Sequence, residues 1–393
     1  MALRPPLRTL ALVLAALLAP PQAARAADPV TISVVLPLTG GGSFLGQQEQ
    51  ASLQRAEAVI AEAGGINGRP VKFAFYDDQS SPQVAVQLAT RLVAAKPNVI
   101  LGSGLVGMCN AMAPLMRRGP VMYCFSPGIY PEPGSFVFSS GVSTKDLAAA
   151  LLTYWQAKGI TRIGVITSTD ASGQDALRNI QELVAKPEHA GITLVEQQRF
   201  NPTDVSAAAQ VERIKAANPQ ALIAWSTGSA IGTVFKAITS AGLDVPVGTT
   251  NGNMTYAQMQ SFAAFLPREL YVPSAEWPQH AGATLPAGVE DAQARFFAAF
   301  GEGGPKPDAS STFSWDPAML VVAALRDVGV DATPEALRDR LARTAGFAGV
   351  NGVYDMQRLP QRGLDLDSVI VTRWDPQAGT WVVVSKPRGM PAG

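Results

Sequence analysis

The sequence predicts an α/β protein built as two doubly wound lobes with parallel sheets. Three observations lead to this fold class. Short β-branched runs alternate with segments of helical periodicity, which predicts parallel strands with helices on both faces. The alternation occurs twice, in residues 30–124 and again in residues 162–248. The 393 residues are enough for two or three domains, and 47% of them are hydrophobic and available for cores.

The first series opens with an apolar, β-branched run at residues 30–36, which predicts a strand. Apolar residues then recur at helical spacing over 45–63, up to a Gly-Gly pair that ends the predicted helix. The remaining elements alternate in the same way: a strand at 71–76, a helix with apolar positions from 84 to 95, a strand at 99–101, a helix ending at 116 and a strand at 121–124.

The second series repeats the pattern after a break at residues 136–145. It predicts strands at 163–167, 192–195, 221–225 and 245–248, with helices at 171–185, 205–217 and 230–241. Three more helices are expected at 289–300, 317–328 and 334–345, followed by a strand pair at 369–374 and 380–384. These breaks predict one lobe from residues 28–144 plus 277–350, and a second lobe from residues 145–276 plus 351–386.

The first 26 residues have the composition of a signal peptide. Arg4 and Arg8 precede an apolar run at residues 9–19, which is too short to span a membrane comfortably. Ala24-Arg25-Ala26 fits the rule for a cleavage site, so cleavage is expected near Ala26. An uncleaved N-terminal membrane anchor is the alternative. Export places the chain in an oxidising compartment, where cysteines can pair.

Composition and motifs argue against several classes of function. Lys+Arg and Asp+Glu both number 31 and no basic patch occurs, so no nucleic-acid partner is expected. Two His and two Cys without ligand spacing predict no metal site. Residues 102–107 match G-x-G-x-x-G, but no acid follows up to residue 131, so no dinucleotide cofactor is expected. No nucleophile elbow occurs, and the chain is not expected to be an enzyme.

A ligand is expected between the two lobes. Ligands of open α/β sheets bind beyond the carboxyl ends of the strands, and two such lobes that face each other form a cleft. The loops that would line this cleft follow the predicted strands, at residues 39–46, 102–109, 125–130, 169–174, 226–229 and 249–254. Helix N-termini that open from several of these loops favour a carboxylate group.

The two cysteines are expected to form a disulfide. Cys109 and Cys124 lie near the carboxyl ends of neighbouring predicted strands. In the chain-entropy model a loop of about 15 residues makes such a bond worth roughly 3 kcal/mol. The alternative is that both are small, unpaired core residues.

Several loop motifs stand in an order that resembles a known family. They are Pro37-Leu38-Thr39-Gly40, the glycine-rich run from Gly64 to Pro70, and the run from Tyr76 to Pro82. Together they resemble the leucine/isoleucine/valine-binding type of periplasmic binding proteins. The resemblance covers essentially the whole chain after the leader. It implies two lobes joined by three crossover strands, ligand capture by lobe closure in the periplasm, and delivery to an inner-membrane ABC permease.

The chain departs from the family pattern at positions that would meet the ligand. Leu105 and Val106 stand where the family has two serines, Leu45 replaces a tyrosine and Ser172 replaces an aromatic residue. The acid that would meet the ligand's α-ammonium falls at Asn251. Loss of a buried charge-assisted hydrogen bond costs on the order of 1.5–3 kcal/mol. The alternative is that Asp170 or Asp316 supplies the acid from a neighbouring loop.

These departures predict a small organic acid as the ligand, such as an aromatic or branched carboxylate or 2-oxo acid, with a branched-chain amino acid as the other choice. Phe44, Leu105, Val106 and Trp225 would form an apolar wall. The complete predicted site is Phe44, Leu45, Gly104, Leu105, Val106, Ser126, Pro127, Gly128, Ser172, Trp225, Thr227 and Asn251.

The predicted function is that of a monomeric solute-binding protein for a transporter. A ligand-sensing protein that signals to a membrane receptor is the alternative, because both would use the same closing cleft. Permease and ATPase genes next to the coding gene would favour transport, and a histidine kinase gene would favour sensing.

Overall fold

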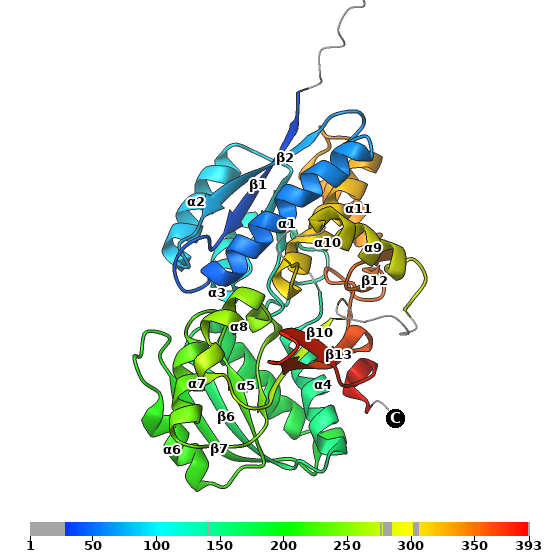
Figure 1. Ribbon diagram of the computed structural model, residues 1–393. Helices are drawn as coiled ribbons and strands as arrows, with labels where there is room; N and C mark the ends of the chain where they lie inside the picture. The colour runs from blue at the N-terminus through cyan, green and yellow to red at the C-terminus, as the bar shows by residue number, and fades with distance from the viewer. Residues whose placement is uncertain (1–27, 140, 276, 278–284, 302–305, 392–393) are drawn as a thin grey trace, which may run out of the picture.

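The computed structural model describes residues 28–391 except 140, 276, 278–284 and 302–305. The predicted leader at residues 1–26 lies outside the described residues. Figure 1 shows two α/β lobes, one above the other, with the chain passing repeatedly between them. No helix in the described part of the chain combines the length and the apolar character needed to cross a membrane.

The first lobe is built on a five-stranded, fully parallel sheet. Its strands are β1 (Val30–Leu36), β2 (Val71–Asp77), β3 (Val99–Gly102), β4 (Val121–Cys124) and β5 (Val137–Ser139). They lie in the order β2-β1-β3-β4-β5. Its helices are α1 (Ser43–Glu62), α2 (Pro82–Ala94), α3 (Val106–Met112), α9 (Val289–Phe300), α10 (Ala309–Val328) and α11 (Pro334–Ala342). Figure 1 shows α2 on one side of the sheet and α1 with α10 on the other.

The second lobe is built on a seven-stranded sheet. Its strands are β6 (Arg162–Ser168), β7 (Thr193–Phe200), β8 (Ala221–Trp225), β9 (Val247–Gly248), β10 (Leu270–Ala275), β13 (Val369–Asp375) and β14 (Thr380–Val383). They lie in the order β14-β13-β10-β9-β8-β6-β7. Its helices are α4 (Thr144–Ala157), α5 (Ala171–Val184), α6 (Ala208–Ala216), α7 (Ile231–Ser240) and α8 (Tyr256–Ser261). This sheet is mixed rather than parallel throughout, because β13 pairs antiparallel with both β10 and β14.

The two-lobed α/β fold predicted from the sequence is confirmed, and the chain crosses between the lobes three times. The crossings follow β5, β10 and the hairpin of β11 (Ala345–Gly349) and β12 (Gly352–Asp355). The boundary predicted at residue 350 divides this hairpin, whose two strands pair with each other. Tyr354 of β12 also donates to Asp316 of α10. We therefore propose that the first lobe extends to residue 355.

Local signals fix most helix starts. Ser81 accepts from the Val84 N–H and Pro82 opens α2, while Ser143 and Asp146 form a capping box at α4. The prediction for α10 was wrong by two turns. A start at Pro317 was expected, but the helix begins eight residues earlier, at Ala309, behind a capping box of Asp308 and Ser311, and Pro317 lies inside it.

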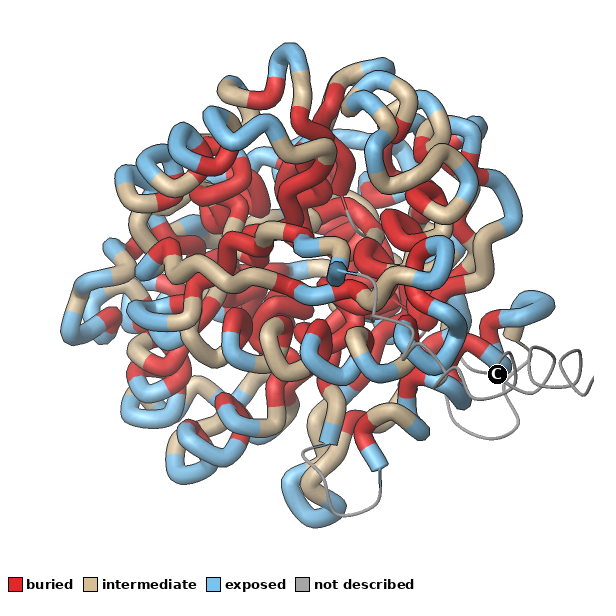
Figure 2. The backbone as a smooth tube through the Cα atoms, turned by 90° about the horizontal axis from the view of Figure 1, so that it is seen from above, coloured by how far each residue is buried: buried red, intermediate tan, exposed pale blue. Residues whose placement is uncertain are grey.

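Six helices and strands escaped the sequence-based prediction: β5, α4, β10, α8, β11 and β12. Helix α4 illustrates why, since it is buried on most of its circumference and offers no polar face for a helical period. Figure 2 shows the buried backbone running through the middle of the molecule beneath an exposed outer layer. The largest fully buried side chains include Trp155, Trp225 and Phe138.

Candidate ligand cleft

A cavity of about 490 Å³ lies between the lobes, at the carboxyl ends of their strands. The first lobe lines it with three loops and the start of α3, and the second lobe with the starts of α5 and α7 and the loop before α6. The lining residues are Gly41, Gly42, Ser80, Pro82, Leu105, Val106, Gly107, Met108, Asp170, Ala171, Ser172, Pro202, Thr203, Thr227, Ser229 and Ala230. Its size fits a small organic molecule.

The first lobe contributes most of the large apolar side chains of this cavity, and the second lobe contributes most of its hydroxyl groups. Leu105, Val106 and Met108 supply the apolar surface from the first lobe. Ser172 and Thr227 face them from the second lobe, with their hydroxyl oxygens 2.9 Å apart. Such a wall suits a ligand with an apolar body and one polar end.

Asp170 is the one charged side chain among the lining residues. It is the N-cap of α5, where its Oδ1 accepts from the Gly173 N–H (3.0 Å) and from the Ser168 hydroxyl (2.6 Å). The carboxylate therefore caps the N-terminus of α5, where the positive end of the helix dipole favours a negative charge.

Asp316, the other acid considered for an ammonium group, lies outside the cleft. Its carboxylate is 1% exposed and accepts from the Val350 N–H, from the backbone and side-chain amides of Asn351, and from the Tyr354 hydroxyl. These bonds hold the β11–β12 turn against α10, so Asp316 has a structural task. Of the two alternative acids, Asp170 is the one that reaches the cavity.

The structure brings four of the twelve predicted site residues together in the main cavity: Leu105, Val106, Ser172 and Thr227. Two others, Pro127 and Asn251, line a second space of about 10 Å³ together with Phe125 and Phe313. That space holds one water molecule at most. Asn251 thus lies outside the main cavity, in the short 3-10 helix η4 (Asn251–Asn253), and its side chain is nearly fully buried.

The remaining six predicted residues line neither space. Trp225 is 2% exposed and belongs to the core, so the predicted apolar wall lacks it. Phe44 packs edge-on against Phe262 of the other lobe, with ring centroids 6.1 Å apart. Leu45 and Gly104 pack together beside Glu49. Ser126 and Gly128 belong to the loop after β4, where the Ser126 hydroxyl accepts from the Gly128 N–H (3.4 Å).

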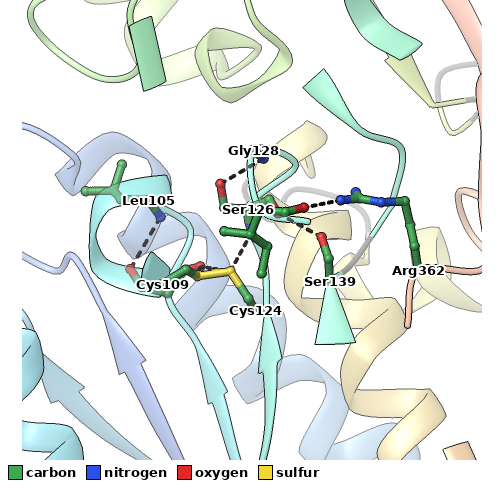
Figure 3. Close-up of a disulfide and its surroundings, with 9 residues drawn as sticks. Leu105, Cys109, Cys124, Ser126, Gly128, Ser139 and Arg362 are labelled. Atoms are coloured by element: carbon green, nitrogen blue, oxygen red, sulfur yellow. Dashed lines mark hydrogen bonds between the residues drawn. A yellow bond between two sulfur atoms is a disulfide. The ribbon is translucent and has the colours of Figure 1, made fainter. Parts of the chain in front are cut away.

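The predicted disulfide between Cys109 and Cys124 is confirmed (Figure 3). Cys109 lies in α3, directly after the cavity-lining segment 105–108, and Cys124 ends β4. The Ser126 N–H donates to the Cys124 sulfur (3.4 Å), so the bond also contacts the loop after β4. The disulfide therefore fastens two adjacent loops of the first lobe beside the cavity.

A buried acidic group at Glu49, beside Leu45 and Gly104, was not predicted from the sequence. Within the described part of the chain, both carboxyl oxygens of Glu49 are buried without a hydrogen-bond partner. Burial and the nearby carboxylates of Asp78 and Asp308 hold the pKa of Glu49 well above its usual range. A signal was present in the sequence, because Glu49 stands four residues from both Leu45 and Leu53 on the apolar face of α1.

These acids predict a protein that is more stable at pH 5.5 than at pH 8. Burial raises the pKa of Asp308 to about 7 and that of Asp78 to about 6. Because these folded-state values exceed those of the unfolded chain, the stabilisation is complete below pH ~4 and is lost as the pH rises through 6 to 7. We expect the free energy of unfolding to fall by on the order of 1–3 kcal/mol over this range.

Urea unfolding at several pH values measures this effect. Glu49→Gln should flatten the dependence, whereas Glu62→Gln, an exposed change on the same helix, should leave it unaltered. Equal pH dependence of the unfolding free energy in both variants and the wild type would show that the Glu49 carboxyl does not contribute to it.

Among the described residues, no group of three or more His, Cys, Asp or Glu side chains is arranged to hold a metal ion.

Two α/β lobes that enclose a cavity between the carboxyl ends of their strands define a two-lobed ligand-binding protein. The chain belongs to the periplasmic binding protein family, whose model matches residues 29–377. The resemblance to the leucine/isoleucine/valine-binding type is confirmed by the Leu/Ile/Val-binding protein homolog 3 of Brucella melitensis biotype 1, which is 24% identical over 233 residues. This match covers 57% of the chain and 62% of that relative, which is less than two thirds of its length.

Solved structures share the fold over nearly the whole chain. An extracellular ligand-binding receptor from Rhodopseudomonas palustris HaA2 superposes with a TM-score of 0.80 at 22% identity, covering 90% of this chain and all but 1% of that one. A solute-binding protein of an ABC transporter from R. palustris, in complex with benzoate, gives 0.74 at 18% identity and covers 93% and 98%. At these identities the likeness shows the fold alone.

Proposed function

We propose that the chain is a monomeric solute-binding protein of the periplasm that captures a small organic acid between its lobes and delivers it to an inner-membrane ABC permease. The observation that carries this proposal is the cavity between the lobes, with Leu105, Val106 and Met108 on one wall and hydroxyl groups on the other. The protein binds its ligand without transforming it.

The N-termini of α5 and α7 supply the polar contacts for a carboxylate. Both helices begin at the cavity, where Ser172 and Ala230 are lining residues. The first-turn N–H groups that Asp170 and the helix carbonyls leave unbonded, together with the positive dipole ends, suit an anionic oxygen without requiring a cationic side chain. The apolar body of the ligand, an aromatic ring or a branched chain, would lie against Leu105 and Val106. Benzoate in a structural neighbour has this chemistry.

The absence of an α-ammonium group from the ligand remains a prediction, and the structure changes its basis. Asn251, on which that prediction depended, lies outside the main cavity. The residue that now bears on the ligand's charge is Asp170, the charged lining residue, whose Oδ1 accepts two hydrogen bonds in the α5 cap. An apolar amino acid is the second candidate, since the Asp170 carboxylate could pair with its ammonium group. The relative named for Leu, Ile and Val binding supports that candidate.

Isothermal titration with matched pairs tests the ligand class. We expect 4-methyl-2-oxopentanoate, phenylpyruvate or benzoate to bind at least about tenfold tighter than leucine or phenylalanine, a difference of about 1.4 kcal/mol. Tighter binding of leucine than of its 2-oxo counterpart would reject the organic acid in favour of the amino acid. If none of these compounds gives a heat of binding, both ligand classes are rejected.

Asp170→Asn separates the two candidates, because asparagine also caps helices well and keeps α5 intact. The Asp170→Asn variant should bind an organic acid as tightly as the wild type or more tightly. Its affinity for an amino acid should be lower by about tenfold or more, because a charge-assisted hydrogen bond is lost. Asp365→Asn, at the cap of a 3-10 helix outside the cavity, is the matched control.

A further inference from the structure

The two lobes touch through their backbones at the edge of the cavity. The Ser229 N–H, just before α7, donates to the Gly41 carbonyl oxygen (2.9 Å), in the loop between β1 and α1. Both residues line the cavity, from opposite lobes. We call this contact of Gly41 with Gly228 and Ser229 the clasp. Because it joins the lobes directly, it exists in the closed arrangement and is lost when they separate.

The clasp requires a glycine at position 228. Gly228 has a φ of +89°, a backbone conformation that other residues rarely adopt. A Cβ built on Gly228 would overlap the Gly41 carbonyl oxygen and approach the Gly42 Cα to 3.5 Å. Both contacted atoms are backbone atoms of the other lobe. They could be relieved only by movement of the loop or by separation of the lobes.

A buried amide holds the second-lobe side of the clasp in shape. Asn253 Oδ1 accepts from the Gly228 N–H (3.0 Å), and Asn253 Nδ2 donates to the Ser226 carbonyl (2.7 Å) and the Thr249 hydroxyl (2.9 Å). Gln258 adds a bond from its Nε2 to the Gly228 carbonyl (2.8 Å). Asn253 and Gln258 are both fully buried. The loop after β8 is thereby fixed to the segment after β9.

Asn253 is absent from the cavity lining, so it acts through the loop rather than on the ligand. We propose that Asn253 is a positioning residue for lobe closure: it holds Gly228 and Ser229 so that the Ser229 N–H meets the Gly41 carbonyl when the lobes close around a ligand. This proposal rests on the proposed binding function. It adds that the balance between open and closed lobes is set by the clasp and by its buried support.

Spin-label distances between the lobes test the proposal. Val86 and Val205 are exposed, at 36% and 99%, and lie close in sequence to Pro82 and Thr203, which line the cavity from opposite lobes. Labels on added cysteines there are selective, because both native cysteines are in the disulfide. Electron–electron double resonance then resolves closed and open populations, without ligand and with each of benzoate, 4-methyl-2-oxopentanoate and leucine.

We expect the wild type to show the short, closed distance. Gly228→Ala should lower the closed-to-open ratio at least about tenfold, since its Cβ acts as a wedge. Asn253→Ala should lower it about three- to tenfold by removing the support of the loop. Gly242→Ala is the matched control: Gly242 has a φ of +62° with open space around it, so the variant has similar backbone strain without a wedge.

Two outcomes would overturn the proposal. In the first, Gly228→Ala is folded by circular dichroism yet keeps the wild-type distribution of spin-label distances. In the second, the wild type lacks the short distance under every condition. If Asn253→Ala does not fold, the closed-to-open ratio of Gly228→Ala still tests the proposal. Failure of the binding function is recognised separately. In that case no compound changes the wild-type distances or gives a titration signal, while the variants still differ from the wild type without ligand.

Discussion

Asp316→Ala should lower the free energy of unfolding by about 3–5 kcal/mol, the cost of breaking a buried polar network on one side. The lost carboxylate accepts from two backbone N–H groups, the Asn351 side chain and the Tyr354 hydroxyl, at distances of 2.8–3.1 Å. Those donors would remain buried without an acceptor. Asp316→Asn, which keeps one oxygen acceptor, should cost less.

Asp327→Ala is the matched control for this prediction. Asp327 lies on the same helix, and its side chain is half exposed in an ion pair with Arg340 (2.6 Å). Such a pair contributes about 0–1 kcal/mol. Guanidinium unfolding followed by circular dichroism gives both values. Similar losses for the two variants would contradict the structural role given to Asp316.

Removal of the disulfide by the double change Cys109→Ala and Cys124→Ala should cost roughly 3 kcal/mol, because the bond closes a loop of 15 residues. That loss corresponds to about 6–12 °C in melting temperature for domains of this size. The ligand affinity should fall as well, since the bond fastens the cavity-lining segment 105–108 beside the loop after β4.

Hydrogen exchange separates a local effect from a global one. We expect faster exchange at residues 102–109 and 124–128 in the double variant, with little change in the second lobe. Reduction of the wild type with dithiothreitol is the parallel experiment and should reproduce the fall in melting temperature. An unchanged melting temperature after complete reduction would mean that the bond contributes nothing to stability.

The fold was predictable because its main elements carry local signals. Strand β1 is a β-branched run, and α2 has both a serine cap and a proline at its first position. The error at α10 arose where two local rules compete. Pro317 is typical of a helix start, yet the capping box of Asp308 and Ser311 sets the start, and the helix continues through the proline.

The site was only partly predictable, because its geometry depends on contacts between distant segments. Of the residues predicted from loop position, Leu105, Val106, Ser172 and Thr227 line the cavity, and their role in binding stays a prediction. The alignment of Asn251 with a ligand-binding acid did not show that this residue, in η4, lines the small second space and not the main cavity. The clasp could not be predicted from the sequence, because Gly41 and Ser229 meet only when both lobes are folded and closed.

A crystal structure of the protein soaked with the tightest-binding acid would locate the ligand directly. We expect density for the ligand in the cavity between the lobes, with its carboxylate at the N-termini of α5 or α7 and its apolar body against Leu105 and Val106. Density elsewhere, for example in the pocket beside Trp315 and Arg295 in the first lobe, would contradict the proposed binding site. So would a carboxylate held by side chains that do not line this cavity.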